Sequence, residues 1–312
     1  MKKFLYLVHG ADYLVKNYTF LGERRAADVL LSTYNKPGKG AYFFPDSTWA
    51  EGRNQLLEKA LELNEEYEYY IFLDDDISFH KGSYERFEDS LNELNPAVAV
   101  PVFIPKTTHS VLGFGISFHH KFFFPLKRYQ VCHLADGQFM AFHKDVIKDR
   151  ILMPLQNQFD EISWWFTSSA QQLLMHNFYG DHTLQMNDVI INNESHREYT
   201  KNDYKEQRAE WFQSQFSVPV ENPRPWAVNL MSLQGIKYFF LNYRIRDLCK
   251  VARQFFNSVA GTFRYKKAES YRLMKEEVLQ KLKPDSVLFK QYMAGRQPYE
   301  TFQQVQKNSR TS

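Results

Sequence analysis

The sequence is poor in cysteine, in long apolar runs and in net charge, and each absence removes a class of protein. Cys132 and Cys249 are the only cysteines among 312 residues, which excludes a disulfide framework and a cysteine zinc site and favours a reducing compartment. No stretch approaches the roughly 20 apolar residues that span a bilayer. A formal net charge of +3 is too small to indicate nucleic-acid binding by itself. We therefore expect a cytoplasmic protein that binds no nucleic acid.

Two nucleotide-binding fingerprints are also missing, whereas aromatic residues are plentiful. The chain contains neither a P-loop nor the glycine pattern of a dinucleotide-binding fold. Its 27 phenylalanines and 19 tyrosines, within a hydrophobic content of 44%, can supply a sizeable core and aromatic-lined clefts. The length allows one large domain, or a core domain with an appendage.

A predicted buried strand that ends in three carboxylates is the most informative feature of the chain. The apolar and aromatic run Tyr69–Leu73 leads directly into Asp74, Asp75 and Asp76. Such a run without alternation is typical of a strand buried on both faces, and in an open α/β sheet its carboxyl end meets the ligand crevice. Adjacent carboxylates repel one another unless a cation lies between them, and oxygen ligands favour Mg²⁺ or Mn²⁺. The favoured interpretation is a metal clamp for a phosphorylated ligand, and a solvated acidic turn stays open.

Strand and helix patterns alternate along the first hundred residues. Phe4–Val8, Val29–Ser32 and Ala97–Val102 read as further short strands. Ser47 or Thr48 can cap a helix that runs to about Asn64, and Tyr84–Leu94 is a second amphipathic helix. This alternation predicts parallel βαβ units with helices on both faces of a sheet.

The chain changes character beyond residue 103. Residues 107–124 predict antiparallel strands or a hairpin at the edge of the sheet, and Asp188–Asn192 predicts a last strand. Ser168 or Ser169 can cap a helix that continues through Asn177.

The domain organisation follows from a cluster of prolines. We expect a catalytic domain at 1–218, a proline-rich linker at 219–228 and a helical C-terminal region at 229–312. Two interpretations of that region stay open: packing onto the catalytic domain or a second subunit, or a basic amphipathic helix on an anionic membrane surface. The second would place the protein at the inner face of the cell membrane, and the first admits a homo-oligomer.

The order of these motifs resembles the GT-A fold of nucleotide-sugar glycosyltransferases. The sequence Ala50–Leu56 contains the Arg-Asn pair of a typical helix start, and Asp74 and Asp76 form an Asp-x-Asp motif after the strand. The pattern is similar to that of the large inverting family with cellulose, chitin and O-antigen sugar transferases, over roughly residues 1–205. The resemblance implies an α/β fold of the GT-A type, with a mixed sheet flanked by helices and a C-terminal helical extension.

The resemblance also implies roles for individual residues. Asp76 would bind Mn²⁺ or Mg²⁺, Asp74 would bind the ribose or a metal-bound water, and His196 would complete the metal shell. Arg53 would face the diphosphate of the donor. Gly137 lies in an Asp-Gly-Gln sequence that is similar to the glycine loop between donor and acceptor.

Two further residues are expected at the donor. Asp75 lies between the two motif aspartates, and His9 ends the first predicted strand, where the nucleotide would lie. Both are therefore candidates for binding the nucleotide sugar.

The chain departs from the family pattern in two places. Ser32–Asn35 replaces the aspartate that would bind the base of the nucleotide, and Ser168-Ser169 replaces a Glu-Asp pair whose second acid would deprotonate the acceptor. The nearest acids are Asp160 and Glu161, of which Glu161 is the preferred base. The alternative, that both are ordinary loop acids, stays open.

These observations predict a metal-dependent, inverting glycosyltransferase. It would move a sugar from a nucleotide-diphosphate donor, with UDP expected, to a hydroxyl of a glycan or glycolipid acceptor in surface polysaccharide synthesis. One alternative is a sugar nucleotidyltransferase, although His9–Tyr13 lacks the glycine-rich loop that such an enzyme has after its first strand. Another is a non-catalytic scaffold with the same fold in a polysaccharide assembly complex.

Overall fold

One mixed sheet forms the centre of the protein. The computed structural model describes residues 3–63, 65–103, 127–132, 137–160, 163–193, 205–218 and 256–296. Within these ranges nine strands form one sheet in the order β3-β2-β1-β4-β8-β6-β9-β5, and β7 also pairs with β9. The strands are β1 (Phe4–Gly10), β2 (Ala27–Thr33), β3 (Tyr42–Phe43), β4 (Tyr69–Asp74), β5 (Ile77–Lys81), β6 (Val98–Phe103), β7 (Tyr129–Val131), β8 (Phe139–His143) and β9 (Thr183–Asn193).

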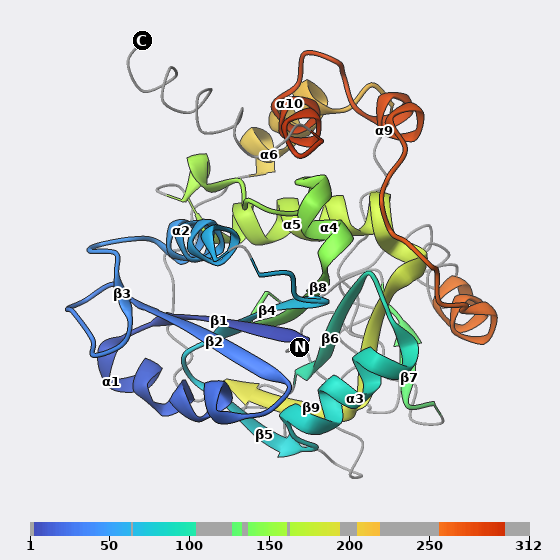
Figure 1. Cartoon of the computed structure of the whole chain (residues 1–312). Coiled ribbons are helices and arrows are strands. Elements are labelled where there is room, and N and C mark those ends of the chain that lie inside the picture. Colours follow the sequence, from blue (N-terminus) through green and yellow to red (C-terminus); the bar gives the residue numbers. More distant parts are fainter. Residues whose placement is uncertain are drawn as a thin grey trace, which may run out of the picture.

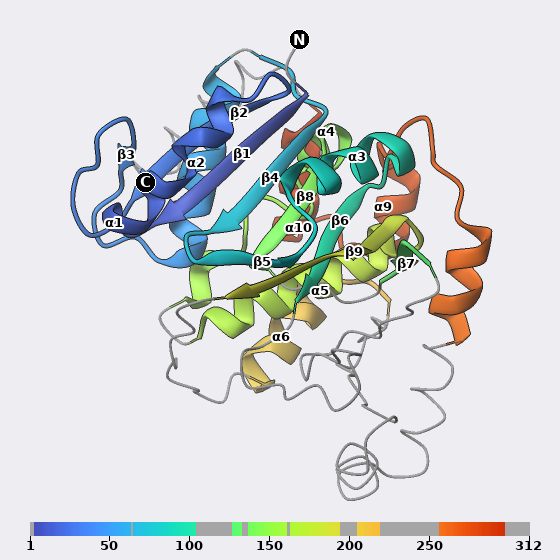
Figure 2. The same ribbon diagram turned by 90° about the horizontal axis from the view of Figure 1, so that it is seen from below.

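The first four strands of this order are parallel, as the alternating pattern predicts. β3, β2, β1 and β4 pair in parallel, so their carboxyl ends lie at one edge of the sheet (Figure 2). β8 then enters antiparallel to both β4 and β6, and β5 and β7 pair antiparallel with β9. The expected fold class, a mixed α/β sheet flanked by helices, is confirmed.

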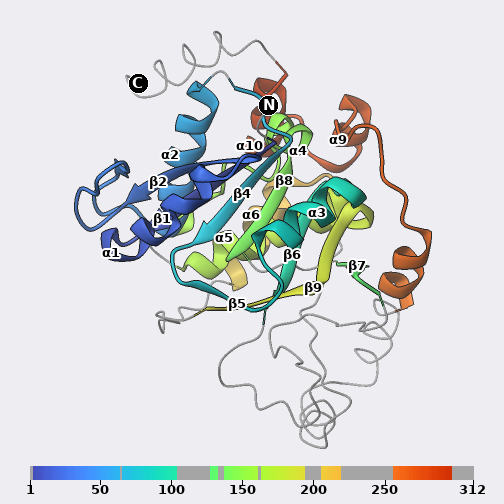
Figure 3. The same ribbon diagram turned by 60° about the horizontal axis from the view of Figure 1, so that its bottom comes forward.

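Helices cover both faces of the sheet. In Figure 1, α2, α4 and α5 lie above the sheet, and α1 and α3 lie below it. Figure 3 shows α3 crossing in front of β6. The helices are α1 (Asp12–Val15), η1 (Lys16–Glu23), α2 (Trp49–Glu62), α3 (Tyr84–Leu94), α4 (Lys144–Asp149), η2 (Asn157–Phe159), α5 (Trp164–Tyr179), η3 (Gly180–His182), α6 (Lys205–Gln215), α9 (Lys275–Lys281) and α10 (Val287–Ala294).

Burial on both faces explains the unbroken apolar runs of the central strands. In β1, Leu5 and Leu7 belong to the hydrophobic cluster between the sheet and helices α2 and α5. Phe4, Tyr6 and Val8 belong to the cluster on the other face, between the sheet and helices η1 and α3. Neighbouring residues of a strand point to opposite faces, so a strand covered on both sides needs apolar residues at every position. β4 follows the same rule.

The helix bounds predicted from the sequence agree with the structure for α2 and α3 but not for the start of α5. α2 begins after Thr48, which forms a capping box with Glu51 as predicted, and α3 has the predicted bounds. The start predicted for the next long helix is wrong, because α5 begins at Trp164 and places Ser168 and Ser169 inside it. Tertiary packing explains the extra turn, since Phe166 is fully buried in the core.

The last predicted strand is longer than expected, and several predicted segments lie outside the described residues. β9 begins at Thr183 because residues 183–186 continue to pair with β6. The predicted edge strands at 107–124 and the linker at 219–228 fall outside the described ranges. The division into domains therefore stays a prediction.

The described part of the C-terminal region packs against α4 and α5. Tyr271, Val278, Leu282 and Tyr292 belong to the same hydrophobic cluster as α2 and α5, and α9 and α10 lie above α4 and α5 in Figure 1. No helix within the described residues is long and apolar enough to cross a membrane.

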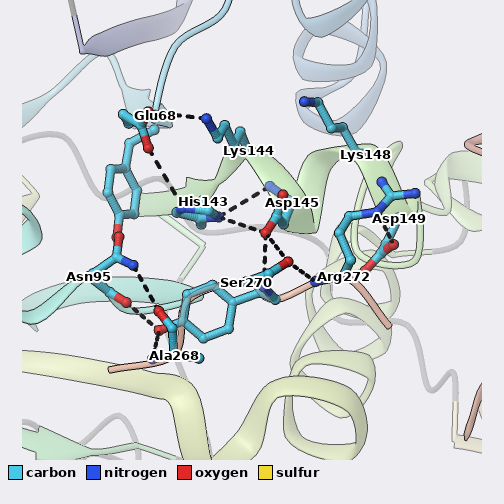
Figure 4. Close-up of polar contacts among 12 residues, drawn as sticks. Glu68, Asn95, His143, Lys144, Asp145, Lys148, Asp149, Ala268, Ser270 and Arg272 are labelled. Atoms are coloured by element: carbon cyan, nitrogen blue, oxygen red, sulfur yellow. Dashed lines mark hydrogen bonds and ion pairs between the residues drawn. The ribbon is translucent and has the colours of Figure 1, made fainter. Parts of the chain in front are cut away.

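An extended stretch of this C-terminal region is bound by two carboxylates of α4 (Figure 4). Asp145 accepts hydrogen bonds from the Ser270 hydroxyl at 2.7 Å and from the Tyr271 N–H at 2.9 Å, and Asp149 accepts from the Leu273 N–H at 2.9 Å. Two residues four positions apart on a helix are separated by about 6 Å along its axis, and so are two residues that lie two positions apart on an extended chain. The two carboxylates therefore match the repeat of the N–H groups that they bind. We call this the Asp145–Asp149 clasp.

Candidate active site at the carboxyl edge of the sheet

The predicted site residues of β1 and β4 come together at the edge where the parallel strands end. The pairing register places His9 beside Asp74 and Gly10 beside Thr33. After β4 ends at Asp74, the chain turns through Asp75 and Asp76 into β5. The carboxyl ends of β1, β2 and β4 thus form one border, as expected for the ligand crevice of an open α/β sheet.

Asp74 is fixed through one of its two oxygens. Its Oδ1 accepts hydrogen bonds from Arg53 Nη2 at 2.7 Å and from the Trp49 indole Nε1 at 2.9 Å. Burial raises the pKa of Asp74 to about 7, although the Arg53 guanidinium and the Trp49 N–H act in the opposite direction. The neighbouring Asp75 and Asp76 raise this pKa further because like charges repel. A bound cation would favour the charged form.

Arg53 is buried and directs its guanidinium toward protein groups. Its side chain is 3% exposed, its Nη1 donates to the Gly137 carbonyl at 2.6 Å, and its guanidinium lies 4.2 Å from the Trp49 ring centroid. The structure therefore brings together Arg53, Asp74 and Gly137, three residues predicted to share a site. The contacts that it shows for Arg53 are with the protein, and a contact with the diphosphate stays a prediction.

Asp75 secures the turn that follows β1. Its Oδ2 accepts a hydrogen bond from the Ala11 N–H at 2.6 Å. A side chain at Gly10 would lie 2.1 Å from the same oxygen, so the close approach of this carboxylate requires glycine. Asp75 thus has a structural contact with the turn after β1, and its predicted contact with the donor stays a prediction.

His9 is a neutral hydrogen-bonding group. Its Nδ1 lies 3.0 Å from Ser32 Oγ, and its ring packs directly on the backbone of Gly52. Burial lowers the pKa of His9 to about 4, and the nearby guanidinium lowers it as well. The Tyr34 ring centroid lies 5.8 Å away, so both rings border the predicted nucleotide site. His9 cannot supply a positive charge to a phosphate at neutral pH.

Asp160 lies at the amino end of α2 and is engaged at both oxygens. It accepts hydrogen bonds from the hydroxyls of Thr48, the N-cap residue of α2, and of Thr167 at 2.6 Å. The positive end of a helix dipole favours a carboxylate in this place. These contacts favour a structural role for Asp160. Glu161, the preferred catalytic base, lies outside the described residues.

The described residues offer two carboxylates for a cation, Asp74 and Asp76. Within the described ranges no group of three or more histidine, cysteine, aspartate or glutamate side chains is placed to hold a metal. His196 lies outside these ranges. β9 ends at Asn193, which pairs with Ile77, the residue after Asp76. Mg²⁺ is commonly held by one or two carboxylates together with substrate phosphates, so this donor set fits an ion shared with a diphosphate.

Trp49 and Tyr18 also contribute to this edge and were not predicted from the sequence. Trp49 is the first residue of α2 and lies four positions before Arg53, so both lie on one face of the helix; that spacing was the available signal. The Tyr18 hydroxyl accepts a hydrogen bond from the Ile77 N–H at 3.1 Å and supports the turn that carries Asp76. Nothing in the local sequence of Tyr18 indicates this contact, because it depends on how η1 packs.

Comparison with known proteins gives similarity at the level of fold. No family model and no curated protein sequence matches the chain. Similar solved structures include TarS 1–349 from S. aureus in complex with UDP-GlcNAc (11% identity, TM-score 0.39, 64% of this chain and 62% of that one). Others are GalNAc-T7 with UDP, GalNAc and Mn²⁺ (9%, 0.44, 64% and 45%) and A197 from STIV (13%, 0.35, 65% and 99%).

The match with the TarS structures spans about three fifths of the TarS 1–349 chain. The protein has a mixed α/β fold with one mixed sheet flanked by helices, as its sequence predicts. The function is therefore argued from the residues of the site.

Proposed function

We propose that the protein is a metal-dependent glycosyltransferase that moves a sugar from a nucleotide-diphosphate donor to a hydroxyl of a glycan or glycolipid acceptor. The observation that carries this proposal is the position of Asp74 and Asp76 at the carboxyl end of a strand buried on both faces. A donor diphosphate and a divalent cation together would explain why like charges gather there.

The roles follow from the contacts of the site. Asp74 and Asp76, with His196, would hold a Mn²⁺ or Mg²⁺ ion, which when bound acts as a Lewis acid toward the diphosphate leaving group. Arg53 fixes one oxygen of Asp74 and the Gly137 carbonyl. Glu161 would accept the proton of the acceptor hydroxyl, which for an inverting reaction lies on the face opposite the leaving group.

The charge of the site makes donor binding depend on the cation. Asp74, Asp75 and Asp76 stand close enough to perturb one another, whereas Arg53 is paired with Asp74. A diphosphate approaching this border would meet net negative charge unless a divalent ion were present. We expect the nucleotide to bind tightly only when Mn²⁺ or Mg²⁺ is bound.

A UDP-sugar is the first donor to test. The sequence resemblance favours UDP, and structures of similar fold hold UDP or UDP-GlcNAc. The hydroxyl and imidazole groups of Ser32, Tyr34 and His9 would replace the aspartate that the family uses for the base. Surface polysaccharide synthesis is the proposed pathway for the product.

The two alternatives differ in how the site supports them. A sugar nucleotidyltransferase is disfavoured because α1 begins at Asp12, directly after the Gly10 turn that Asp75 occupies, so the glycine-rich phosphate loop is missing. A non-catalytic scaffold remains the alternative, because Ser168 and Ser169 replace the Glu-Asp pair that includes the catalytic base of the family. Membrane contact and a homo-oligomer, both predicted for residues 229–312, remain proposals for the complete C-terminal region.

The proposed function is tested by ligand-dependent thermal stability. UDP-, GDP-, CMP- and dTDP-sugars are each added with and without Mn²⁺, because a ligand that binds the folded state alone raises the unfolding temperature. We expect UDP-sugars with Mn²⁺ to raise it and Asp76→Asn to abolish the rise. Asp181→Asn, a change at an exposed aspartate of η3, is the matched control. If no nucleotide sugar shifts the wild type, the donor-binding proposal is wrong.

A further inference from the structure

Trp49 contacts both partners of the ion pair at the end of β4. Its indole N–H donates to Asp74 Oδ1 at 2.9 Å, the oxygen that also accepts from Arg53 at 2.7 Å. The Arg53 guanidinium stacks on the Trp49 ring with 4.2 Å between its central carbon and the ring centroid. Each of these three side chains therefore limits the rotamers of the other two.

The same tryptophan supports the turn before β8. A Cβ atom on Gly137 would lie 3.0 Å from two ring carbons of Trp49, so the ring underlies this glycine directly. Arg53 Nη1 donates to the Gly137 carbonyl at 2.6 Å, and the Asp74 N–H donates to the Gln138 carbonyl at 2.8 Å. The end of β4 and the turn at Gly137 and Gln138 are thus joined through both backbone and side chains.

The geometry distinguishes the two oxygens of Asp74. Oδ1 accepts two N–H donors, which fixes the plane and the direction of the carboxylate. Oδ2 is then the oxygen of Asp74 that is left for a cation. Because the carboxylate plane is fixed, the position of Oδ2 is set before any ligand binds. Groups that orient a metal ligand in this way usually change metal affinity by about 10- to 100-fold when they are removed.

We propose that Trp49 is a positioning residue that fixes the Asp74 carboxylate and the Gly137–Gln138 turn as one unit, with Asp74 Oδ2 presented to a divalent cation. This inference rests on the proposed function, because it assigns Trp49 to the metal and donor site. Trp49 itself need not touch the substrate. Its indole N–H orients Asp74, and its ring supports Arg53 and Gly137.

The test compares Trp49→Phe with the wild type in UDP binding at increasing Mn²⁺ concentration, measured by calorimetry. Phenylalanine keeps a ring under Arg53 and Gly137 and removes the N–H donor. We expect the half-saturating Mn²⁺ concentration to rise about tenfold. UDP binding at saturating Mn²⁺ should change much less, because the remaining donor contacts are kept. A general loss of folding would not produce this split between metal and nucleotide.

Trp211→Phe is the matched control, because Trp211 is buried in α6 against Phe166 and Phe212. It should lower thermal stability and leave the Mn²⁺ dependence unchanged. If Trp49→Phe fails to fold, Gly137→Ala replaces it, since the added methyl group would lie 3.0 Å from two ring carbons of Trp49 and the ring must shift by a few tenths of an ångström. Mn²⁺ binding should then weaken in the same direction but by less.

The outcomes separate the inference from the proposed function. An unchanged Mn²⁺ dependence in Trp49→Phe, or in Gly137→Ala where that variant is used, would overturn the role of Trp49 while donor binding stands. An equal change in Trp211→Phe would also overturn it, because the effect would then be one of stability. If the wild type binds neither Mn²⁺ nor UDP, the proposed function fails, and the role assigned to Trp49 fails with it.

Discussion

Two groups of carboxylates lie at opposite ends of β4 and solve the problem of burial in different ways. Beyond the amino end, the Asp145–Asp149 clasp binds backbone N–H groups of the C-terminal stretch; Figure 4 shows Asp145 beside Ser270 and Asp149 beside Arg272. At the carboxyl end, Asp74, Asp75 and Asp76 follow one another along the chain; burial raises the pKa of Asp74, and its two neighbours raise it further. The same residue type is thus used for cohesion at one end and, as we propose, for ligand binding at the other.

The surroundings of the two groups explain the difference. Asp145 has its pKa lowered by hydrogen bonds from Tyr271 and Ser270 and by the nearby His143, although burial opposes them. Asp74 also has N–H donors and an arginine, yet its pKa is raised to about 7 because burial and like-charged neighbours prevail. Asp149 in the clasp also has its pKa raised by burial, although it accepts hydrogen bonds from the Leu273 N–H and the Tyr179 hydroxyl. The two ends therefore differ in their like-charged neighbours: two carboxylates follow Asp74 in the chain, and a cation could relieve their repulsion.

The largest expected effect concerns the carboxyl end. Asp76→Asn should lower sugar transfer, or hydrolysis of the donor, by about a thousandfold, since it removes a proposed metal ligand and with it the stabilisation of the leaving group. Release of UDP from UDP-sugars with Mn²⁺ is the measurement. The contrast with the clasp predicts that Asp145→Asn retains most of this activity. If Asp76→Asn were as active as the wild type, the proposed difference between ligand-binding carboxylates at the carboxyl end of β4 and structural carboxylates in the clasp would be wrong.

The next effect concerns the support of Asp74. Arg53→Lys keeps the charge but cannot reach both Asp74 and the Gly137 carbonyl in the fixed geometry of a guanidinium. We expect the Mn²⁺ concentration required for half-maximal UDP binding to rise about 10- to 100-fold. Calorimetric titrations at several Mn²⁺ concentrations measure it. Arg25→Lys, at a residue outside the site, is the control and should show no shift.

A smaller effect is expected in stability at the amino end. Asp145→Ala removes the acceptor for the Ser270 hydroxyl and the Tyr271 N–H, and should lower the free energy of unfolding by about 2 kcal/mol. Urea denaturation followed by circular dichroism measures this loss. UDP binding in the presence of Mn²⁺ should persist in the folded variant. A loss of binding without a loss of stability would mean that the clasp acts on the site directly.

The smallest effect is a pair of opposite pH dependences within the clasp. The folded-state pKa of Asp145 is lowered, so its stabilisation is present above the unfolded value of about 4 and is lost as the pH falls further. Burial raises the pKa of Asp149 to about 6, so its contribution is present below pH 4 and is lost as the pH rises through 6.

Urea denaturation between pH 3 and pH 8 tests this pair. Relative to wild type, the free energy of unfolding of Asp149→Asn should increase as the pH rises from 4 to 7. Asp145→Asn should be less stable than wild type above pH 4, and this difference should shrink below pH 4. His143 lies 3.7 Å from Asp145 and titrates differently in the folded state, and replacing Asp145 would change that titration. Both variants are therefore compared with their parent in a His143→Gln background. Parallel curves for the two variants would contradict the assignment.

Much of the fold could be predicted because the signals are local. The unbroken apolar run of Tyr69–Leu73, the Thr48–Glu51 capping box and the bounds of α3 all follow from neighbouring residues. The start of α5 could not be predicted in this way, because burial of Phe166 extends the helix by one turn beyond the serines that could cap it.

Part of the arrangement at this edge of the sheet could also be predicted, whereas the roles of its residues stay predictions. The order of motifs placed Arg53, Asp74 and Gly137 in one site, and the structure joins them by hydrogen bonds. The spacing of Trp49 and Arg53 indicates a shared helix face, but it does not show that both donate to one oxygen of Asp74. The contact of Asp75 with the Ala11 N–H has no signal in the sequence. Both contacts depend on rotamers that packing selects between segments far apart in the chain.

The most direct test of the account is UDP binding to the wild type with and without a divalent cation. Because three aspartates adjoin the proposed diphosphate site and Arg53 is paired with Asp74, we predict that calorimetry detects UDP binding with Mn²⁺ and none when the cation is chelated. UDP binding of equal affinity in the presence of chelator would contradict the claim that the aspartates at the end of β4 share a cation with the donor.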